Sequence, residues 1–383
     1  MTDDQLSTLR VESPAALRAE VRAFLRAEID SGAFTPDVDS WMTGFDPAFS
    51  RRLGERRWLG MTMPPEYGGQ GRTPVERFVI TEEMLAHGAP VAAHWIADRQ
   101  MAPGILANGT EEQRRRYIPG ISAGTVYFAI GMSEPDAGSD LAGVRTRATD
   151  NGDSWTISGT KVWTTGAHIA HAMVLLARTD GTPDDRQQGL SQFVVDLPHP
   201  DIEIRPIRSI DGQSHFNEVI FHDAVVGSAA LLGRRGHGWQ QVMSELAFER
   251  SGPERYLSTL PLLRAWTDHL REQGATPQQR AALGKLTAQA WALRQMSLQV
   301  ARELAAGGKP DVLAAMVKDL GSTFEGDLVT AVRDASAIVP HRKGSTHLER
   351  LLAQSVLHSP AFTLRGGTNE ILRGIVARGL GIR

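Results

Sequence analysis

Two stretches in the middle of this 383-residue chain combine residue types that could hold a flat ring system. The loop Ser133–Asp140 is rich in serine, glycine and proline, and its hydroxyls and backbone N–H groups suit a polar ring edge or a pyrophosphate. Downstream, Trp163 and Thr165 lie two residues apart, so an extended strand would point the indole and the hydroxyl to the same side. That pair could cover and hydrogen-bond a flavin, although a tryptophan is more often simply part of a core.

A third stretch near the C-terminus, Leu364–Arg373, could bind a phosphate. Two glycines precede Thr368, which is a suitable N-cap for the helical run that follows. Free backbone N–H groups and the positive end of the helix dipole would gather at that point. Taken alone, this stretch is equally typical of a plain helix start, and the serine-rich loop is more typical of a surface connection.

Composition limits what else the chain can do. Its 41 Lys and Arg against 44 Asp and Glu give a net charge of −3, which provides no basic surface for nucleic acid. The absence of cysteine excludes disulfides, thiolate metal sites and a cysteine nucleophile, so redox chemistry would depend on a bound cofactor. The acidic, polar N-terminus lacks the features of a secretory signal, and no apolar run is long enough to span a membrane. We therefore expect a cytoplasmic protein.

The elements that must position these stretches begin with helices and continue with strands. Helical patterns dominate from Ser13 to about Ser122, with Ser13 as an N-cap and Thr110 opening a capping box. Short apolar runs separated by turn signals follow from about Gly124 to Gly233, and the lack of helices between them disfavours a parallel doubly wound sheet. The expected strands are Trp155–Trp163, Met173–Arg178, Gln192–Asp196 and Glu218–Phe221.

The helical pattern returns after residue 238. Thr276 with Gln279 forms another capping box, and apolar residues then share one face of a long helix until Gly307 and Gly308 end it. The chain therefore has the order helices, strands, helices.

The order and spacing of these stretches strongly resemble the acyl-CoA dehydrogenase family of flavoproteins, over nearly the whole chain. The further motifs that carry the resemblance are Pro65–Gly71, Gly109–Gln113, Gly236–Trp239, Glu249–Arg250 and Gly367–Glu370. The resemblance implies an α+β protein whose three domains match the three zones above. They are an N-terminal α-helical domain (residues 1–122), a middle β-barrel domain (residues 123–232) and a C-terminal four-helix bundle (residues 233–383).

The same resemblance implies that FAD binds between the β domain and the C-terminal bundle. The residues implied to hold it lie just before and on the serine-rich loop, on the strand after it and at the last helix start: Ile130, Met132, Ser133, Ser139, Trp163, Thr165, Thr368, Asn369 and Glu370. Relatives also receive an arginine for the diphosphate from a second subunit. Arg271 is its nearest match here, although the phenylalanine of the usual Arg-x-x-Phe-Gly loop is missing.

The family's reaction removes an α proton from an acyl-CoA thioester while a hydride leaves the β carbon, so a carboxylate base must reach Cα. Many members carry this base immediately before Gly-Thr near the C-terminus, but this chain has Gly366 there. A minority carries it in a Glu-Arg pair on a helix of the bundle, and Glu249–Arg250 fits that pattern. The resemblance thus implies Glu249 as the base and Glu254 as a weaker candidate; the alternative is an exposed helical Glu-Arg pair.

Further residues are implied to contact the substrate: Ser139, Arg250, Gly366, Gly367, His94 and Arg99. The region of His94 and Arg99 lines the far end of the acyl pocket in relatives, although a packed helix would explain both residues as well. No metal site is predicted, because His168 and His171 flank a strand start and no third ligand accompanies them.

We therefore predict an FAD-dependent acyl-CoA dehydrogenase that acts on a branched or bulky acyl chain and passes electrons to an electron-transfer flavoprotein. The expected assembly is a homotetramer or an α2β2 heterotetramer, without nucleic acid or membrane partners. Two alternatives stay open: a partner subunit with an incomplete site in a hetero-oligomeric acyl-CoA dehydrogenase, or a related flavin monooxygenase. A thioester on a carrier protein, in place of CoA, also stays open.

Overall fold

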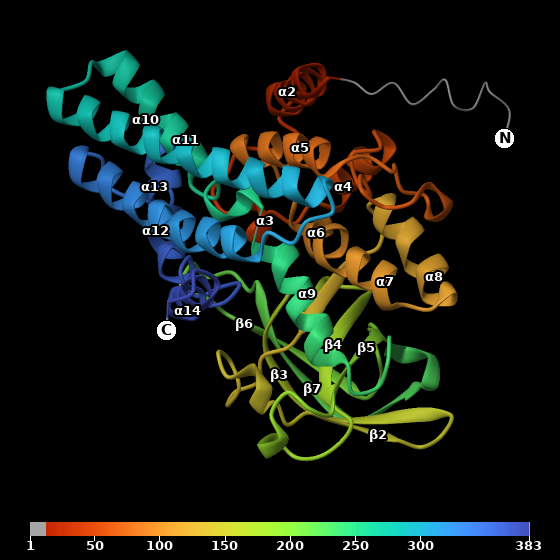
Figure 1. Ribbon diagram of the computed structural model, residues 1–383. Coiled ribbons are helices and arrows are strands. Elements are labelled where there is room, and N and C mark those ends of the chain that lie inside the picture. Colours follow the sequence, from red (N-terminus) through yellow and green to blue (C-terminus); the bar gives the residue numbers. More distant parts are fainter. Residues whose placement is uncertain (1–12, 251, 383) are drawn as a thin grey trace, which may run out of the picture.

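The structure, a computed structural model, describes residues 13–250 and 252–382, and for residues 245–250 only the backbone. Helices occupy both ends of the chain and pack above a domain of strands, as Figure 1 shows. The N-terminal helices are α2 (Pro14–Asp30), α3 (Ser40–Thr43), α4 (Pro47–Glu55), α5 (Pro74–Ala86), α6 (Ala92–Ile96), α7 (Ala102–Asn108) and α8 (Glu111–Ser122). The C-terminal helices are α9 (Gly238–Arg250), α10 (Leu260–Gln273), α11 (Pro277–Ala305), α12 (Asp311–Ala335), α13 (His347–His358) and α14 (Asn369–Gly379). The predicted order of helices, strands and helices is confirmed.

Side-chain caps set the beginnings of several helices. Ser13 accepts a hydrogen bond from the backbone N–H of Ala16 at the start of α2, and reciprocal capping boxes open α8 at Thr110 and α11 at Thr276. A cap of this kind contributes about 1 kcal/mol to helix stability. All three predicted N-caps are therefore confirmed.

The middle of the chain forms one eight-stranded sheet in which most neighbouring strands are antiparallel. The strands are β1 (Phe128–Gly131), β2 (Arg147–Asp150), β3 (Ser154–Thr165), β4 (Ala172–Arg178), β5 (Leu190–Asp196), β6 (Ile202–Ile207), β7 (Phe216–Gly227) and β8 (Leu231–Leu232). Their order is β6-β7-β3-β2-β4-β5-β8, and β1 pairs in parallel with β4. The four predicted strands correspond to β3, β4, β5 and β7, each of which is longer than expected.

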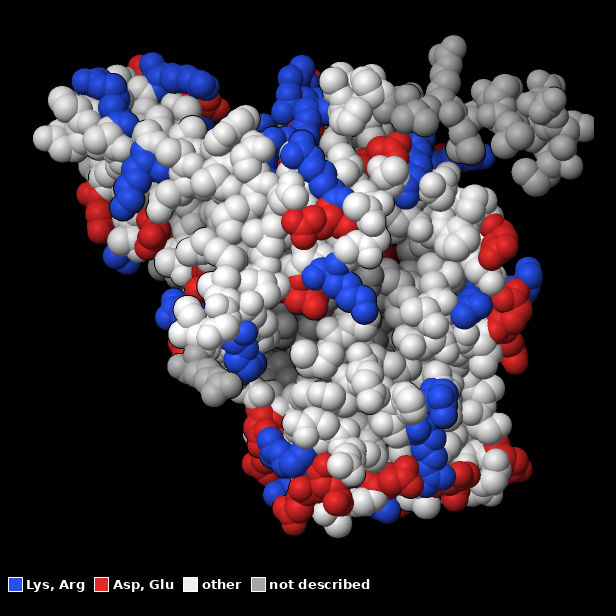
Figure 2. Space-filling view, viewed as in Figure 1, with Lys and Arg blue, Asp and Glu red and all other residues white. Residues whose placement is uncertain are grey.

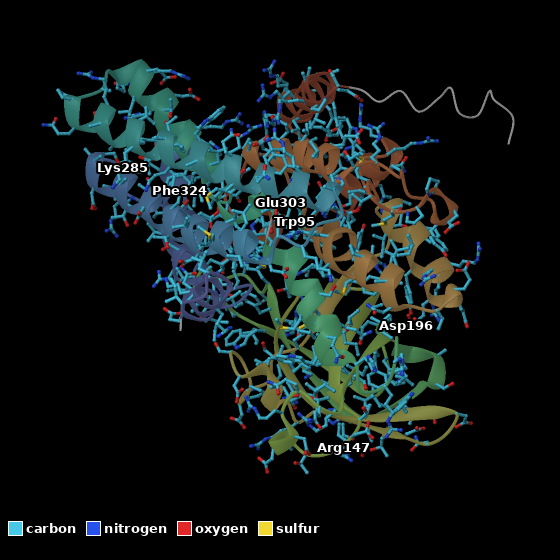
Figure 3. All side chains as sticks on the ribbon, in the orientation of Figure 1. Trp95, Arg147, Asp196, Lys285, Glu303 and Phe324 are labelled. Atoms are coloured by element: carbon cyan, nitrogen blue, oxygen red, sulfur yellow. The ribbon has the colours of Figure 1, made fainter. Side chains whose placement is uncertain are left out.

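A single apolar core joins the N-terminal and C-terminal helices. It contains Trp95 of α6 and Phe324 of α12, both labelled in Figure 3, together with Trp266 of α10. The rings of Trp41 and Trp95 lie 6.0 Å apart within it. Helix α9 connects this core to the sheet, because it packs against β5 on one side and α12 on the other. No helix within the described residues is both long and apolar enough to cross a membrane.

Candidate active site

The space-filling view shows a hollow between the lower end of the C-terminal helices and the β domain (Figure 2). Helices α9 and α14 and the upper ends of the strands surround that region in the ribbon view (Figure 1). Glu249 and Arg250 are the last two residues of α9, so the candidate base belongs to the helix that links the two domains. The side chains of both residues lie outside the described part of the structure, and the placement of this base remains a prediction.

A buried ion pair anchors the serine-rich loop to the sheet. Lys161 of β3 is fully buried, and its Nζ donates to Glu134 Oε1 at 2.8 Å and to the carbonyl oxygen of Met132 at 3.0 Å. Burial lowers the pKa of Lys161 to about 8, while Glu134 opposes that shift. Glu134 also accepts hydrogen bonds from the backbone N–H groups of Arg145 and Thr146. Hydrogen bonds from residues of the β domain to Glu134 and Met132 therefore hold the loop in place.

Trp163 is turned outward by an irregularity in β3. The pairing of β3 with β7 shifts register between Lys161 and Thr164, and Trp163 adopts a φ of 60° inside that shift. A bulky residue rarely adopts this left-handed conformation, and it commonly does so at functional sites. The indole is 58% exposed and lies edge-on to Phe216 at 5.9 Å. The strand thus presents a flat apolar face, with Thr165 half-buried two residues further on.

The start of α14 has the geometry expected of a phosphate-binding helix end. Gly366 and Gly367 adopt φ values of 72° and 90°, and Thr368 then caps the helix by accepting a hydrogen bond from the backbone N–H of Ile371. Because a positive φ favours glycine, a glutamate at position 366 would be strained there. The missing base at this position is therefore consistent with the backbone conformation of the loop.

The three residues predicted to bind the cofactor at α14 have different surroundings. Thr368 is the cap, Glu370 is exposed, and Asn369 is only 3% exposed. The side-chain oxygen of Asn369 accepts from Lys318 Nζ at 2.9 Å and from Ser322 Oγ at 3.0 Å, and both donors belong to α12. Asn369 therefore holds the helix start against the bundle, a positioning role that its sequence context did not distinguish from a ligand contact.

A second buried network lies directly before this loop and joins two domains. Arg365 donates from Nη1 to both carboxylate oxygens of Asp39, and its guanidinium lies 4.4 Å from the ring centroid of Trp41. Its Nη2 donates to Ser258 Oγ at 3.2 Å and lies 3.8 Å from Glu325 Oε2. Burial raises the pKa of Glu325 to about 7, although Arg365 and a hydrogen bond from Ser258 counteract the shift.

Asp39, Ser258 and Glu325 were not predicted from the sequence. These residues share no motif and come together only in the folded chain, where their side chains are buried. Arg365 stands next to the predicted glycines, but its partner is 326 residues away. A buried charged side chain needs a partner of opposite charge. This general requirement is the only basis on which the sequence could indicate such a network.

The predicted acyl-pocket residues occupy two environments. Arg99 lies on a π-helical turn at Ala97–Met101, and its guanidinium contacts the carboxylate of Glu254, which is fully buried. Such turns occur frequently at functional sites. His94 is buried in the N-terminal domain with Nδ1 2.8 Å from Ser50 Oγ, and burial lowers its pKa to about 4. Glu254 therefore forms a buried ion pair with Arg99. His94 is a buried histidine that is uncharged at neutral pH.

The remaining predicted residues are accessible. Ile130 at the end of β1, Met132 just after it and Ser133 at the start of the loop are half-buried, and Ser139 is exposed. Arg271, near the end of α10, has a side chain that is 74% exposed and pairs with Asp268 at 2.8 Å. The loop and Trp163 thus belong to the β domain and the start of α14 to the C-terminal helices, so their common contact with FAD stays a prediction.

Comparison with known proteins identifies this arrangement. Residues 12–125, 129–224 and 236–381 match the N-terminal, middle and C-terminal domains of acyl-CoA dehydrogenase, respectively. The chain is 33% identical over 379 residues to "Acyl-CoA dehydrogenase FadE29" from Mycobacterium tuberculosis, with 94% of each protein covered. Among solved structures it is similar to "Tcur3481-Tcur3483 steroid ACAD" with a TM-score of 0.85 and 29% identity, over 98% of this chain and 100% of that one. It is also similar to the ChsE4-ChsE5 complex from Mycobacterium tuberculosis, with a TM-score of 0.81 and 26% identity over 98% and 100% of the two chains.

These matches define the class of the protein as a three-domain flavin-dependent oxidoreductase that acts on CH–CH groups. The chain belongs to the acyl-CoA dehydrogenase family. FAD is the cofactor of that family, and the described residues fit it. The exposed indole of Trp163 offers a stacking face, and the glycine-rich start of α14 offers backbone N–H groups to a phosphate.

Proposed function

We propose that this protein catalyses the α,β-dehydrogenation of an acyl-CoA thioester and that Glu249 takes the α proton. The observation that carries the assignment is the glycine at 366, since its φ of 72° and its missing side chain remove the base that many relatives place there. Glu249 is the next candidate, because it lies at the end of α9, which packs against both β5 and α12. When bound, FAD supplies the acceptor for the hydride that leaves the β carbon.

The chain's own residues then have separable tasks. Glu249 accepts the proton from Cα, and the two electrons of the broken Cα–H bond form the new double bond as the hydride departs from Cβ. Backbone N–H groups near the start of α14 can polarise the thioester carbonyl, which stabilises the developing negative charge. Trp163 excludes water from one face of the site.

Glu254 is the competing carboxylate in the same region. Its side chain is fully buried and contacts the guanidinium of Arg99. Glu254 Oε1 also lies 3.4 Å from Arg255 Nε. These contacts hold the carboxylate between two arginines, which disfavours a role in proton abstraction. We therefore assign Glu254 to the wall of the acyl site, where it positions Arg99.

We further propose a branched or bulky acyl group as the substrate. Support comes from the named relative that is a steroid acyl-CoA dehydrogenase and from the assignment of the base to the bundle rather than to the last loop. The proposed electron acceptor is an electron-transfer flavoprotein, and the proposed assembly is a homotetramer or an α2β2 heterotetramer. The exposed Arg271 and the structural similarity to a complex of two named chains support an assembly in which subunits share cofactor sites.

The test is anaerobic bleaching of the flavin by a panel of straight, branched and ring-bearing acyl-CoA thioesters. Glu249→Gln should retain the visible flavin spectrum and lose bleaching by a factor of about 10² to 10⁴, the usual contribution of a general base. Glu272→Gln, at an exposed position near the end of α10, is the control and should bleach as the wild type does. Normal bleaching by Glu249→Gln would contradict the base assignment.

The same experiment addresses assembly. If the purified chain is colourless and becomes yellow only with a related chain, it is a partner subunit whose site is completed by that chain. Bleaching by no acyl thioester in either state, together with oxygen-dependent turnover on supplied reduced flavin, would contradict the dehydrogenase proposal.

A further inference from the structure

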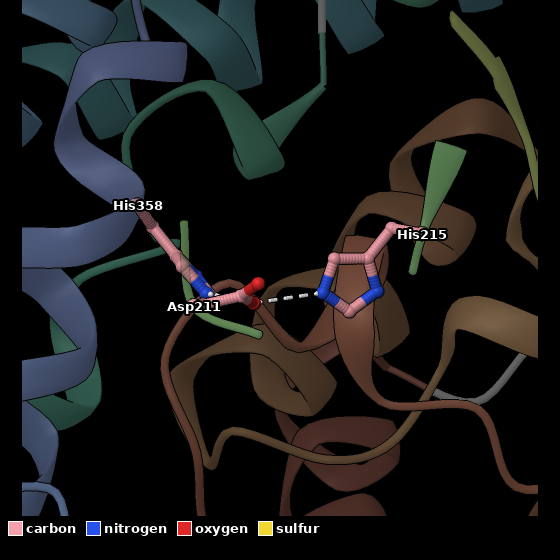
Figure 4. A group of neighbouring side chains, drawn as sticks. All are labelled: Asp211, His215 and His358. Atoms are coloured by element: carbon pink, nitrogen blue, oxygen red, sulfur yellow. Dashed lines mark hydrogen bonds and ion pairs between the residues drawn. The ribbon is translucent and has the colours of Figure 1, made fainter. Parts of the chain in front are cut away.

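Three side chains from two domains converge at a point that the dehydrogenase chemistry does not use. Asp211 and His215 lie on the segment between β6 and β7, and His358 is the last residue of α13. As Figure 4 shows, the two imidazoles approach the same carboxylate from different directions. His215 Nε2 and His358 Nε2 each lie 3.0 Å from Asp211 Oδ2.

This group has the composition and the size of a metal site. The ligand atoms of the three residues lie within 4.8 Å of one another. A metal ion bonded to each at about 2.0–2.1 Å would require separations of about 3.3 Å, so small side-chain movements suffice. Two imidazoles and one carboxylate are a ligand set that zinc binds in proteins.

The surrounding groups orient the ligands as outer partners of metal sites do. His358 Nδ1 lies 3.5 Å from Asp39 Oδ2, so the nitrogen that would not bind the metal faces a carboxylate. Asp211 Oδ1 accepts a hydrogen bond from the backbone N–H of Gln213 at 2.9 Å, which leaves Oδ2 directed at the histidines. A carboxylate behind a ligating histidine fixes its orientation and raises its basicity.

Burial and electrostatics favour a cation at this point. Asp211 and His358 are 3% and 7% exposed, and the side chain of His215 is 12% exposed. A site so far removed from water screens charge weakly. His358 also lies at the C-terminal end of α13, where the helix dipole favours positive charge.

A cavity of about 220 Å³ adjoins the group and is lined in part by Asp37, Asp211 and Gln213. A polar cavity of this size has room for an ordered water, which would complete a four-coordinate ion. Arg342 and Arg350 line the same cavity, and Asp211 is the member of the group that borders it.

We propose that Asp211, His215 and His358 bind a zinc ion that links the β domain to the C-terminal bundle. Each imidazole would coordinate through Nε2 and keep its proton on Nδ1. For His358 that proton points toward Asp39 of the N-terminal domain, so all three domains meet at the ion. Because the ligands come together only in the folded chain, zinc would stabilise the folded state.

The test uses the full-length, flavin-loaded protein, freed of metal by a chelator and then titrated with zinc chloride. One equivalent of bound zinc per chain, measured by atomic emission, and a rise in the thermal unfolding midpoint are expected. Cobalt in place of zinc should give visible bands typical of tetrahedral nitrogen and oxygen coordination.

The diagnostic variant is His215→Ala, and the matched control is His168→Ala. His168 is also a histidine of the β domain with one side-chain partner, since its Nδ1 lies 2.9 Å from Asn217 Oδ1, but it is not part of the group. The control should bind one equivalent and the variant none, with the flavin retained in both. X-ray absorption on the zinc-loaded wild type should show nitrogen and oxygen ligands at about 2.0–2.1 Å.

Substoichiometric zinc in the wild type, or equal binding by His215→Ala, would overturn the proposal. Neither outcome bears on dehydrogenation, because no measurement here depends on turnover.

Discussion

Arg365 of the C-terminal domain donates from one nitrogen to both carboxylate oxygens of Asp39 in the N-terminal domain, at 2.7 and 2.8 Å. Both side chains are almost fully buried, at 11% and 4% exposed. The next two residues are Gly366 and Gly367, which lead into α14. The pair therefore fixes the loop that begins α14 against a different domain, and the loop's geometry depends on a contact far away in sequence.

Replacing Arg365 by glutamine should destabilise the protein strongly. The change leaves Asp39 as a buried, partly unpaired charge, which costs about 3 kcal/mol or more in the free energy of unfolding. Arg373→Gln is the matched control, because Arg373 is 62% exposed and pairs with Asp319 at 3.2 Å, so its loss should cost less than about 1 kcal/mol. Urea unfolding followed by tryptophan fluorescence measures both. Equal losses for the two variants would show that the Asp39 contact does not stabilise the fold.

Glu325 should give the protein an unusual loss of stability toward neutral pH. Its pKa is raised from 4.5 to about 7 by burial, so between these values the folded state keeps a proton that the unfolded chain has released. The free energy of unfolding therefore falls as pH rises through this window on account of Glu325, by roughly 3 kcal/mol at most. Carboxylates whose pKa is lowered, such as Glu134, act in the opposite direction at lower pH.

Glu325→Gln should remove that dependence. The amide oxygen can still accept from the backbone N–H of Ser258, which donates to Glu325 Oε1 at 2.7 Å. The difference in the free energy of unfolding between the variant and the wild type should therefore be near zero at pH 4.5. It should grow in favour of the variant toward pH 7, as thermal unfolding at a series of pH values will show. A constant difference across the series would mean that Glu325 does not titrate in this range.

The sequence predicted well what local chemistry determines. Ser13, Thr110 and Thr276 cap helices as expected, because a cap is decided by residues three positions apart. The sequence did not indicate that the indole of Trp163 is exposed, because strand alternation does not reveal a register shift.

What the sequence did not predict depends on contacts between distant residues. Asn369 is predicted to contact the cofactor, and the sequence did not indicate that its side-chain oxygen also accepts hydrogen bonds from Lys318 and Ser322, about fifty residues earlier on α12. The sequence did not indicate the three candidate zinc ligands as a group, because His358 is 147 residues from Asp211. Metal-ligand spacing is recognisable in sequence when the ligands occur in closely spaced pairs at characteristic intervals.

Lys161 and Glu134 should depend on each other in stabilising the protein and in retaining FAD. Lys161→Met leaves a buried carboxylate without its cation, which should cost about 3 kcal/mol or more in stability and release flavin. Adding Glu134→Gln should recover much of the loss, because the second change removes the unpaired charge. Lys285→Met, at an exposed position on α11, is the control and should leave both properties unchanged. Additive losses in the double variant would contradict a coupled pair.

Trp163→Gly should separate cofactor binding from folding. The indole is 58% exposed and its backbone has a φ of 60°, so little burial is lost and the strain of a non-glycine residue is relieved. The free energy of unfolding measured without flavin should therefore change by less than about 1 kcal/mol. Trp155→Ala, at a buried position of the same strand, should instead lose about 3–5 kcal/mol. Bound FAD per chain, measured from the visible absorbance after gel filtration, should fall clearly in Trp163→Gly. Full retention of FAD by this variant would mean that the outward indole faces something other than the flavin ring.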